Sequence, residues 1–208
     1  MRKIEFLIAL SALILLVFPL PQSIYGAVPP PGDDVFGMYA DDNFNDDASD
    51  ENPTFVFIEL GVVQVFIYLT NVSAPTIGGY EFALAYDSSG ELPIVVDAGL
   101  PPYSFNVAPL PEYVVGLAVP MLPDEYGHAI LATPVYFVYV STPVYVSVTP
   151  TSMPMVPDQI IYIEFDDTSI WHAMHPASGN FIDPIFAFNM GIVAVENATW
   201  TDVKALYR

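Results

Sequence analysis

The chain has 208 residues and a formal net charge of −20 at pH 7, and it is 53% hydrophobic but only 13% charged. Disordered chains combine low hydrophobicity with high charge, so this composition predicts one domain-sized unit with a packed core. All of its basic residues lie near the two ends of the chain, at Arg2, Lys3, Lys204 and Arg208, which argues against nucleic-acid binding and phosphoryl chemistry because both neutralise phosphate with such cations.

Residues 1–26 have the pattern of a secretory signal peptide. Arg2 and Lys3 form a positive start, and an apolar run follows from Phe6 to Phe18. We expect cleavage after Gly26 or Ala27, which places the protein outside the cell or on the cell surface with no remaining membrane span. Retention of the segment as an uncleaved anchor is the alternative. The chain contains no cysteine, so a secreted domain of this kind depends on its core, and on any bound metal, for stability.

A Pro-rich lead-in at residues 27–34 and a short predicted strand precede the most acidic segment, residues 41–52, DDNFNDDASDEN. Like charges at this density repel unless cations lie among them, and calcium prefers such oxygen ligands. The predicted calcium ligands are Asp41, Asn43, Asn45, Asp47, Asp50 and Glu51. An EF-hand loop needs Gly at the position of Asp46 and Glu at that of Asn52, so the match is partial. A solvated acidic loop is the alternative.

Residues 35–197 read as short strands between turns. Tyr80, Phe82, Leu84 and Tyr86 alternate with smaller or polar residues, and the run 87–90, DSSG, ends this strand as a turn. Apolar runs of similar length recur up to about residue 195, and prolines interrupt them too often for helices. This pattern predicts an all-β fold, an antiparallel β-sandwich of about nine strands, with residues 198–208 as a C-terminal tail.

Val63–Leu92, VQVFIYLTNVSAPTIGGYEFALAYDSSGEL, resembles the opening of cohesin-like domains, and Gly127–Val148 resembles the same family's Gly-led hairpin. The resemblance implies a jelly-roll or immunoglobulin-like sandwich of the carbohydrate-binding and cohesin superfamily, in a secreted bacterial protein. It also implies protein or glycan recognition without catalysis. The acidic loop after Ala40 and the histidine segment near His172 depart from the family pattern.

Two further patterns bear on chemistry. His172 and His175, near Asp166, Asp167 and Asp183, form a His-x-x-His pair, but this spacing fixes no common face in a strand or loop, and no zincin signature accompanies it. Packing and hydrogen bonding are the favoured roles for both histidines. The chain has no G-x-S-x-G elbow and no cysteine nucleophile, and nothing in the sequence selects a serine to pair with a histidine.

The sequence therefore predicts a secreted or cell-surface, non-catalytic module for binding or assembly. Its expected partner is an extracellular protein or a neutral polysaccharide. A protein partner is favoured over a polysaccharide because neither Trp171 nor Trp200 lies in a predicted strand that would serve as a sugar platform. Two alternatives stay open: a calcium-stabilised structural subunit of an extracellular layer, and a polysaccharide hydrolase that uses two facing carboxylates.

Overall fold

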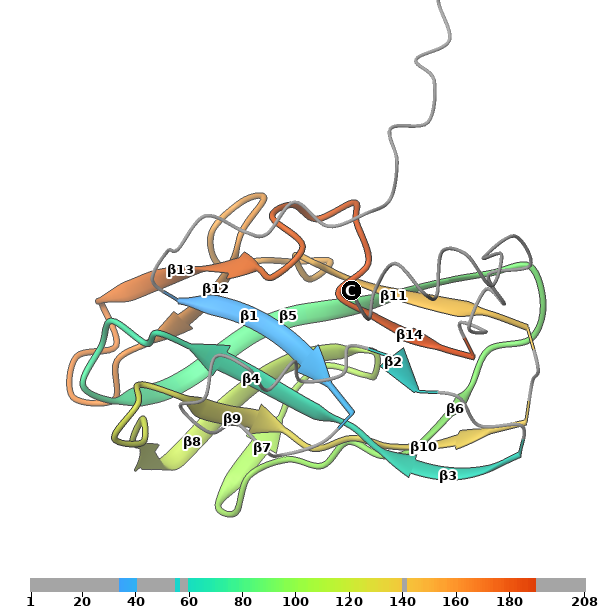
Figure 1. The fold of residues 1–208 in the computed structure, drawn as a ribbon. Coiled ribbons are helices and arrows are strands. Elements are labelled where there is room, and N and C mark those ends of the chain that lie inside the picture. The colour runs from blue at the N-terminus through green and yellow to red at the C-terminus, as the bar shows by residue number, and fades with distance from the viewer. Residues whose placement is uncertain (1–33, 41–54, 57–59, 140–141, 190–208) are drawn as a thin grey trace, which may run out of the picture.

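The computed structural model describes residues 34–40, 55–56, 60–139 and 142–189 (Figure 1). The signal segment, the lead-in apart from Asp34, the six predicted calcium ligands and the C-terminal tail lie outside these residues. Every regular element in the described residues is a strand, which confirms the all-β prediction. These residues form no helix of the length and hydrophobicity that crossing a membrane requires.

The strands follow the chain as β1 (Val35–Tyr39), β2 (Phe55–Val56), β3 (Gly61–Gln64), β4 (Phe66–Thr70), β5 (Ile77–Ser88), β6 (Ile94–Asp97), β7 (Ser104–Asn106), β8 (Glu112–Met121), β9 (Ala129–Ala132), β10 (Val135–Val138), β11 (Val144–Thr149), β12 (Ile160–Ile163), β13 (Trp171–Pro176) and β14 (Phe186–Phe188). The strands outnumber the predicted nine partly because single irregular residues divide longer extended stretches. Val65 alone separates β3 from β4, for example.

Most strands belong to one strongly curled sheet that resembles half of a barrel, and β3, β10 and β6 form a smaller antiparallel sheet (Figure 1). The large sheet is mixed, whereas the sequence predicted an antiparallel fold. Its parallel pairs are β1 with β13 and β2 with β14. Each joins strands that are far apart in the chain, where no short turn imposes an antiparallel return.

The longest strand, β5, runs through the middle of the large sheet and confirms the predicted alternation. Tyr80, Phe82 and Leu84 are buried on its inner face. The Phe82 ring stacks on Tyr113 with centroids 4.7 Å apart and meets the edge of Phe36 at the same distance. Burying one such side chain contributes roughly 1.5–3 kcal/mol, so this aromatic layer is a principal source of stability.

Residues 150–159 leave the sheet between β11 and β12 and return to the same edge of β5. Thr149 of β11 pairs with Ala83, and Ile161 of β12 pairs with Glu81, which lies two residues earlier in β5. The segment contains three prolines, which lack the N–H that a continuous ladder needs. The loop 150–159 therefore lies beside the outer face of β5. This is the face opposite the buried aromatic side chains of that strand.

Candidate functional site

A row of paired residues crosses five strands on the outer face of the large sheet. Phe105 of β7 lies opposite Gly116 of β8, which lies opposite Gly79 of β5. Gly79 in turn lies opposite Ile163 of β12, and Ile163 opposite Trp171 of β13. Residues paired in this way project from the same face of a sheet. The two glycines therefore form a low floor between larger apolar side chains.

Neighbouring atoms leave no room for a side chain at either glycine. A Cβ atom at Gly116 would lie 2.7 Å from the Phe105 ring, and one at Gly79 would lie 2.7 Å from the Val115 carbonyl oxygen and 3.5 Å from Ile163. The Phe105 ring thus lies over Gly116 of β8 while 58% of the residue stays exposed. A larger residue at Gly116 would displace the Phe105 ring, and one at Gly79 would push against the backbone of β8 at Val115.

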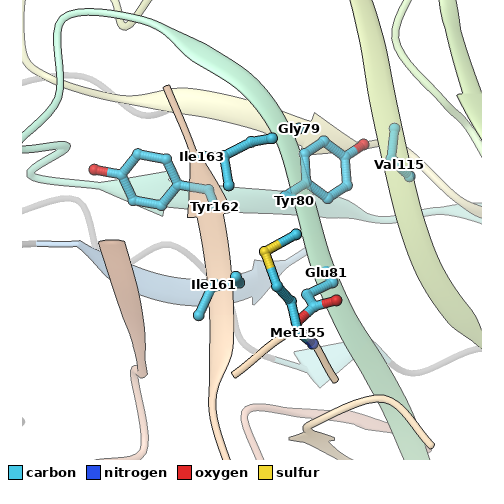
Figure 2. Close-up of a pocket in the computed structure, with 8 residues that line it drawn as sticks. All are labelled: Gly79, Tyr80, Glu81, Val115, Met155, Ile161, Tyr162 and Ile163. Carbon is cyan, nitrogen blue, oxygen red and sulfur yellow. The ribbon is translucent and has the colours of Figure 1, made fainter. Parts of the chain in front are cut away.

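The loop 150–159 adds two methionines to this surface. Met155 is 63% exposed and Met153 is 88% exposed. Figure 2 shows the Met155 side chain directed toward Gly79 and Ile163, over a cavity of about 60 Å³. Ligand pockets in proteins hold roughly 300–1,000 Å³, so this cavity suits one inserted side chain better than a whole small molecule. We call Phe105, Met153, Met155, Ile163 and Trp171 the Met155 face.

Two glutamates hold the loop in place. Oε1 of Glu81 accepts a 2.7 Å hydrogen bond from the Met155 amide, and the two carboxylate oxygens of Glu112 accept from the Ser152 amide and hydroxyl at 3.2 and 3.1 Å. Glu81 is buried, and burial raises its pKa, an effect that hydrogen bonds from the Met155 and Val156 amides partly offset. Both carboxylates are therefore engaged in positioning the loop.

A separate group of polar residues, the Asp34 cluster, joins distant parts of the chain. Oδ1 of Asp34 accepts hydrogen bonds from the Tyr162 hydroxyl at 2.6 Å and the Ser73 amide at 2.8 Å, and Oδ2 accepts from the Ser73 hydroxyl at 2.7 Å. Ser73 Oγ also lies 3.2 Å from Nδ1 of His172, whose Nε2 lies 3.0 Å from Oε1 of Glu164. The cluster connects the start of β1, the turn after β4, β12 and β13.

The proton of the Ser73 hydroxyl can be assigned from its geometry. A serine hydroxyl has one proton, and the shorter contact directs it to Asp34. The two ring nitrogens of His172 bridge the Ser73 hydroxyl oxygen and the Glu164 carboxylate. The ring also stacks on Tyr162 with centroids 4.8 Å apart.

Ser73, His172 and Glu164 are the residue types of a hydrolase triad, and sequence reasoning did not select them. A nucleophilic serine gives its proton to the histidine and needs nearby N–H donors for the developing oxyanion. Here the hydroxyl donates to Asp34. The amides of Ser73 and Ala74 also have acceptors within the protein, on Asp34 and Tyr162 respectively. This geometry suits a cross-link between strands.

The histidines and Trp171 take more specific places than the sequence indicated. His172 and His175 both lie in β13, where a separation of three residues puts them on opposite faces. The residues described by the structure contain no group of three His, Asp or Glu side chains suited to a metal ion. Trp171 begins β13 and is 46% exposed, whereas the sequence indicated no strand there that would serve as a sugar platform.

No protein-family model, no curated protein and no solved structure matches this chain. The fold and the site define its class: an all-β protein with a broad apolar face, a cavity of side-chain size and a buried polar cross-link.

Proposed function

We propose that this protein is a secreted or cell-surface, non-catalytic binding module that docks a protein partner on the Met155 face. The observation that supports this most directly is the exposure of large apolar side chains on this surface. Met155 at the cavity, Met153 in the same loop, and Phe105 and Trp171 at the two ends of the row are each about half exposed or more. Contiguous exposed apolar surface of this kind marks interaction sites. Aromatic residues and methionine are enriched at the centres of protein interfaces, and flexible methionines adapt to a partner's shape.

The arrangement of this face favours a protein over a neutral polysaccharide. Phe105 and Trp171 stand at opposite ends of the row, four strand spacings or about 19 Å apart. Between them lie aliphatic and methionine side chains, which offer no flat ring for sugar stacking. The cavity under Met155 instead suits an apolar side chain inserted by a partner, as at interface hot spots.

The chemistry of the polar groups supports the non-catalytic part of the proposal. Glu81 and Glu112 hold the loop 150–159, and the Ser73 hydroxyl donates to Asp34. A reaction would have to break these contacts before any of the three groups became available. Calcium at the acidic segment remains part of the proposal and rests on the ligand pattern of residues 41–52 alone.

We also propose the finer fold, a sandwich of the jelly-roll or immunoglobulin-like type related to cohesin-like domains, in which the two parallel pairs depart from the all-antiparallel arrangement. The segment EFALAYD, part of the resemblance, lies in β5, the strand with the most partners in the large sheet. In addition, β3 with β4 and β10 with β9 run as two long adjacent stretches through both sheets. Long antiparallel neighbours of this kind are typical of sandwich folds.

The test begins with capture from the secreted proteins of the source organism, beside a panel of neutral polysaccharides, each with calcium and with chelator. The dissociation constant of any captured and identified protein is then measured for wild type, Met155→Ser and Trp171→Ala. We expect each variant to bind at least ten-fold more weakly, which corresponds to about 1.4 kcal/mol. The matched control is Ile182→Ser, because Ile182 is 87% exposed and lies outside the face.

Three results would contradict the proposal. Equal binding by wild type and both face variants would remove the Met155 face from the interaction. Retention by a polysaccharide with no captured protein would make the module a carbohydrate binder. Release of sugar during the incubation would show that the protein is an enzyme.

A further inference from the structure

The small sheet carries a second exposed apolar surface, distinct from the Met155 face. Val62 of β3, Phe137 of β10 and Ile94 of β6 form one row across its three strands. Val62 is 63% exposed and Ile94 is 53% exposed. Neighbouring inward residues such as Tyr136 pack in the core. An antiparallel sheet with one solvated face normally has polar residues on that face. This row is apolar, which is unusual for a face that stays in contact with solvent.

The outer strand of this sheet has an open edge within the described residues. Among them β6 pairs only with β10. An edge strand presents backbone N–H and C=O groups that a further strand can use. Leu92, Ile94 and Val96 are all exposed along this segment. β6 itself contains neither lysine nor proline, the residues that commonly protect such edges. Pro93, directly before β6, has no N–H to donate, so the part of the edge that can pair is Ile94–Asp97. The edge therefore offers both hydrogen bonds and apolar contact.

The charges beside this edge identify the partner's chemistry. Glu91 and Asp97 are exposed at the two ends of the β6 segment, six residues or about 20 Å apart. The described residues contain no Lys or Arg that would neutralise them. A second copy of this chain would bring further carboxylates to the same place, and each copy has a net charge of −20. Charge complementarity thus favours a partner with a cation at each end of an apolar strand.

We propose that β6 accepts an extended segment of a partner protein as an additional strand. The segment's apolar side chains, at alternate positions, cover the small-sheet face, and Lys or Arg residues at its two ends pair with Glu91 and Asp97. Main-chain hydrogen bonds supply affinity in such strand addition, and side chains at alternate positions supply specificity. This site lies in a different sheet from the Met155 face, so the two can be tested independently.

The probe is a fluorescent peptide of alternating valine and threonine with two lysines at each end, and its binding is followed by anisotropy. Its first twin has glutamates in place of the lysines. Its second twin keeps the lysines but has proline at two central positions, which prevents strand pairing. We expect the lysine peptide to bind wild-type protein at least ten-fold more tightly than either twin.

Two protein variants locate the site. Glu91→Lys with Asp97→Asn should lose the preference for the lysine peptide and bind the glutamate twin better than wild type does. Asparagine at 97 can still accept the 2.8 Å hydrogen bond from the Gly99 amide, so the turn after β6 is kept. Ile94→Thr with Val96→Thr should weaken binding of the lysine peptide at least five-fold, since threonine keeps β-branching but removes apolar surface. Met155→Ser should bind it as wild type does.

Equal binding of the lysine peptide and its proline twin would overturn the proposal, because it would show general attraction to an acidic protein. Unchanged binding after the Glu91 and Asp97 changes, in variants whose circular dichroism matches wild type, would also overturn it. Loss of peptide binding in Met155→Ser would assign the peptide to the other face.

Discussion

Two buried carboxylates in this protein are accommodated in different ways. Asp34 is 7% exposed and Glu81 is 6% exposed, and the described residues provide no Lys or Arg to pair with either. Asp34 accepts three hydrogen bonds from an amide and two hydroxyls. Glu81 accepts from backbone amides of one loop, and burial raises its pKa despite them.

The difference shows that neutral donors can replace cations around a buried acid when enough of them converge. Each hydrogen bond to a charged group contributes about 1.5–3 kcal/mol, and the desolvation of a carboxylate costs several kcal/mol. The donors to Asp34 come from two separate parts of the chain, at Ser73 and Tyr162, so they also fix the tertiary structure. The contacts of Glu81 fix a local loop.

The largest effect is expected for Asp34→Ala. The Tyr162 hydroxyl and the Ser73 amide would lose their acceptor, and alanine would be strained at the φ of 60° that Asp34 adopts. We expect a loss of about 3 kcal/mol in the free energy of unfolding, measured with urea. Asp34→Asn should lose clearly less, because asparagine keeps one acceptor oxygen and tolerates this backbone conformation. Equal losses in the two variants would show that the hydrogen bonds are not responsible.

Tyr162→Phe should have the next largest effect. The change removes one donor to Asp34 and leaves the packing of the ring intact, so we expect a loss of about 1–2 kcal/mol. Tyr103→Phe is the control, because Tyr103 is 77% exposed and its hydroxyl is free to bond with water. A loss of equal size in both variants would contradict the assigned role of the Tyr162 hydroxyl.

Glu81→Gln should stabilise the protein at neutral pH, in contrast to any change at Asp34. Glutamine still accepts from the Met155 amide but carries no charge to desolvate. The raised pKa of Glu81 means that the folded state holds its proton more tightly than the unfolded state does. Wild-type stability from this group is thus present below the unfolded pKa and is lost as pH rises through the folded pKa.

The measurement is the difference in urea unfolding free energy between Glu81→Gln and wild type from pH 4 to pH 7. This difference should grow as pH rises. Glu125→Gln, a change at an exposed loop residue, serves as the control and should give a flat difference. A Glu81→Gln variant less stable than wild type at pH 7 would show that the ionised carboxylate favours the loop.

The smallest effect is expected for His172→Gln. The pair of His172 with Glu164 is only partly buried, with side chains 23% and 17% exposed, and such pairs contribute less than about 1 kcal/mol. The measurement is the urea unfolding free energy of His172→Gln beside wild type. A loss well above about 1 kcal/mol would contradict the minor role of this pair.

The parts of this structure that the sequence predicted are those governed by local pattern. Tyr80, Phe82 and Leu84 point inward because successive residues of a strand alternate between faces. The Asp34 cluster could not be predicted from the sequence because Ser73 and Tyr162 lie 39 and 128 residues from Asp34. Nothing in the local sequence specifies that parallel pairing of β1 with β13 brings them together.

The Met155 face could be predicted from the sequence only in part, for the same reason. The prolines of residues 150–159 indicated an interruption, yet they did not indicate that the segment returns to β5. Gly79, which follows Gly78, and Gly116 both lie within strand patterns, and the local sequence does not single them out. Their importance depends on a register that places them opposite each other, between Phe105 and Ile163.

The neutral donors around the two buried acids have a consequence for ionic strength. Dissolved ions weaken attraction between exposed opposite charges over a Debye length of about 8 Å at physiological concentration, but they act much less on short contacts from hydroxyls and amides. The same ions reduce the mutual repulsion of the protein's acidic residues, which give it a charge of −20. The folded state should therefore become more stable as sodium chloride is added.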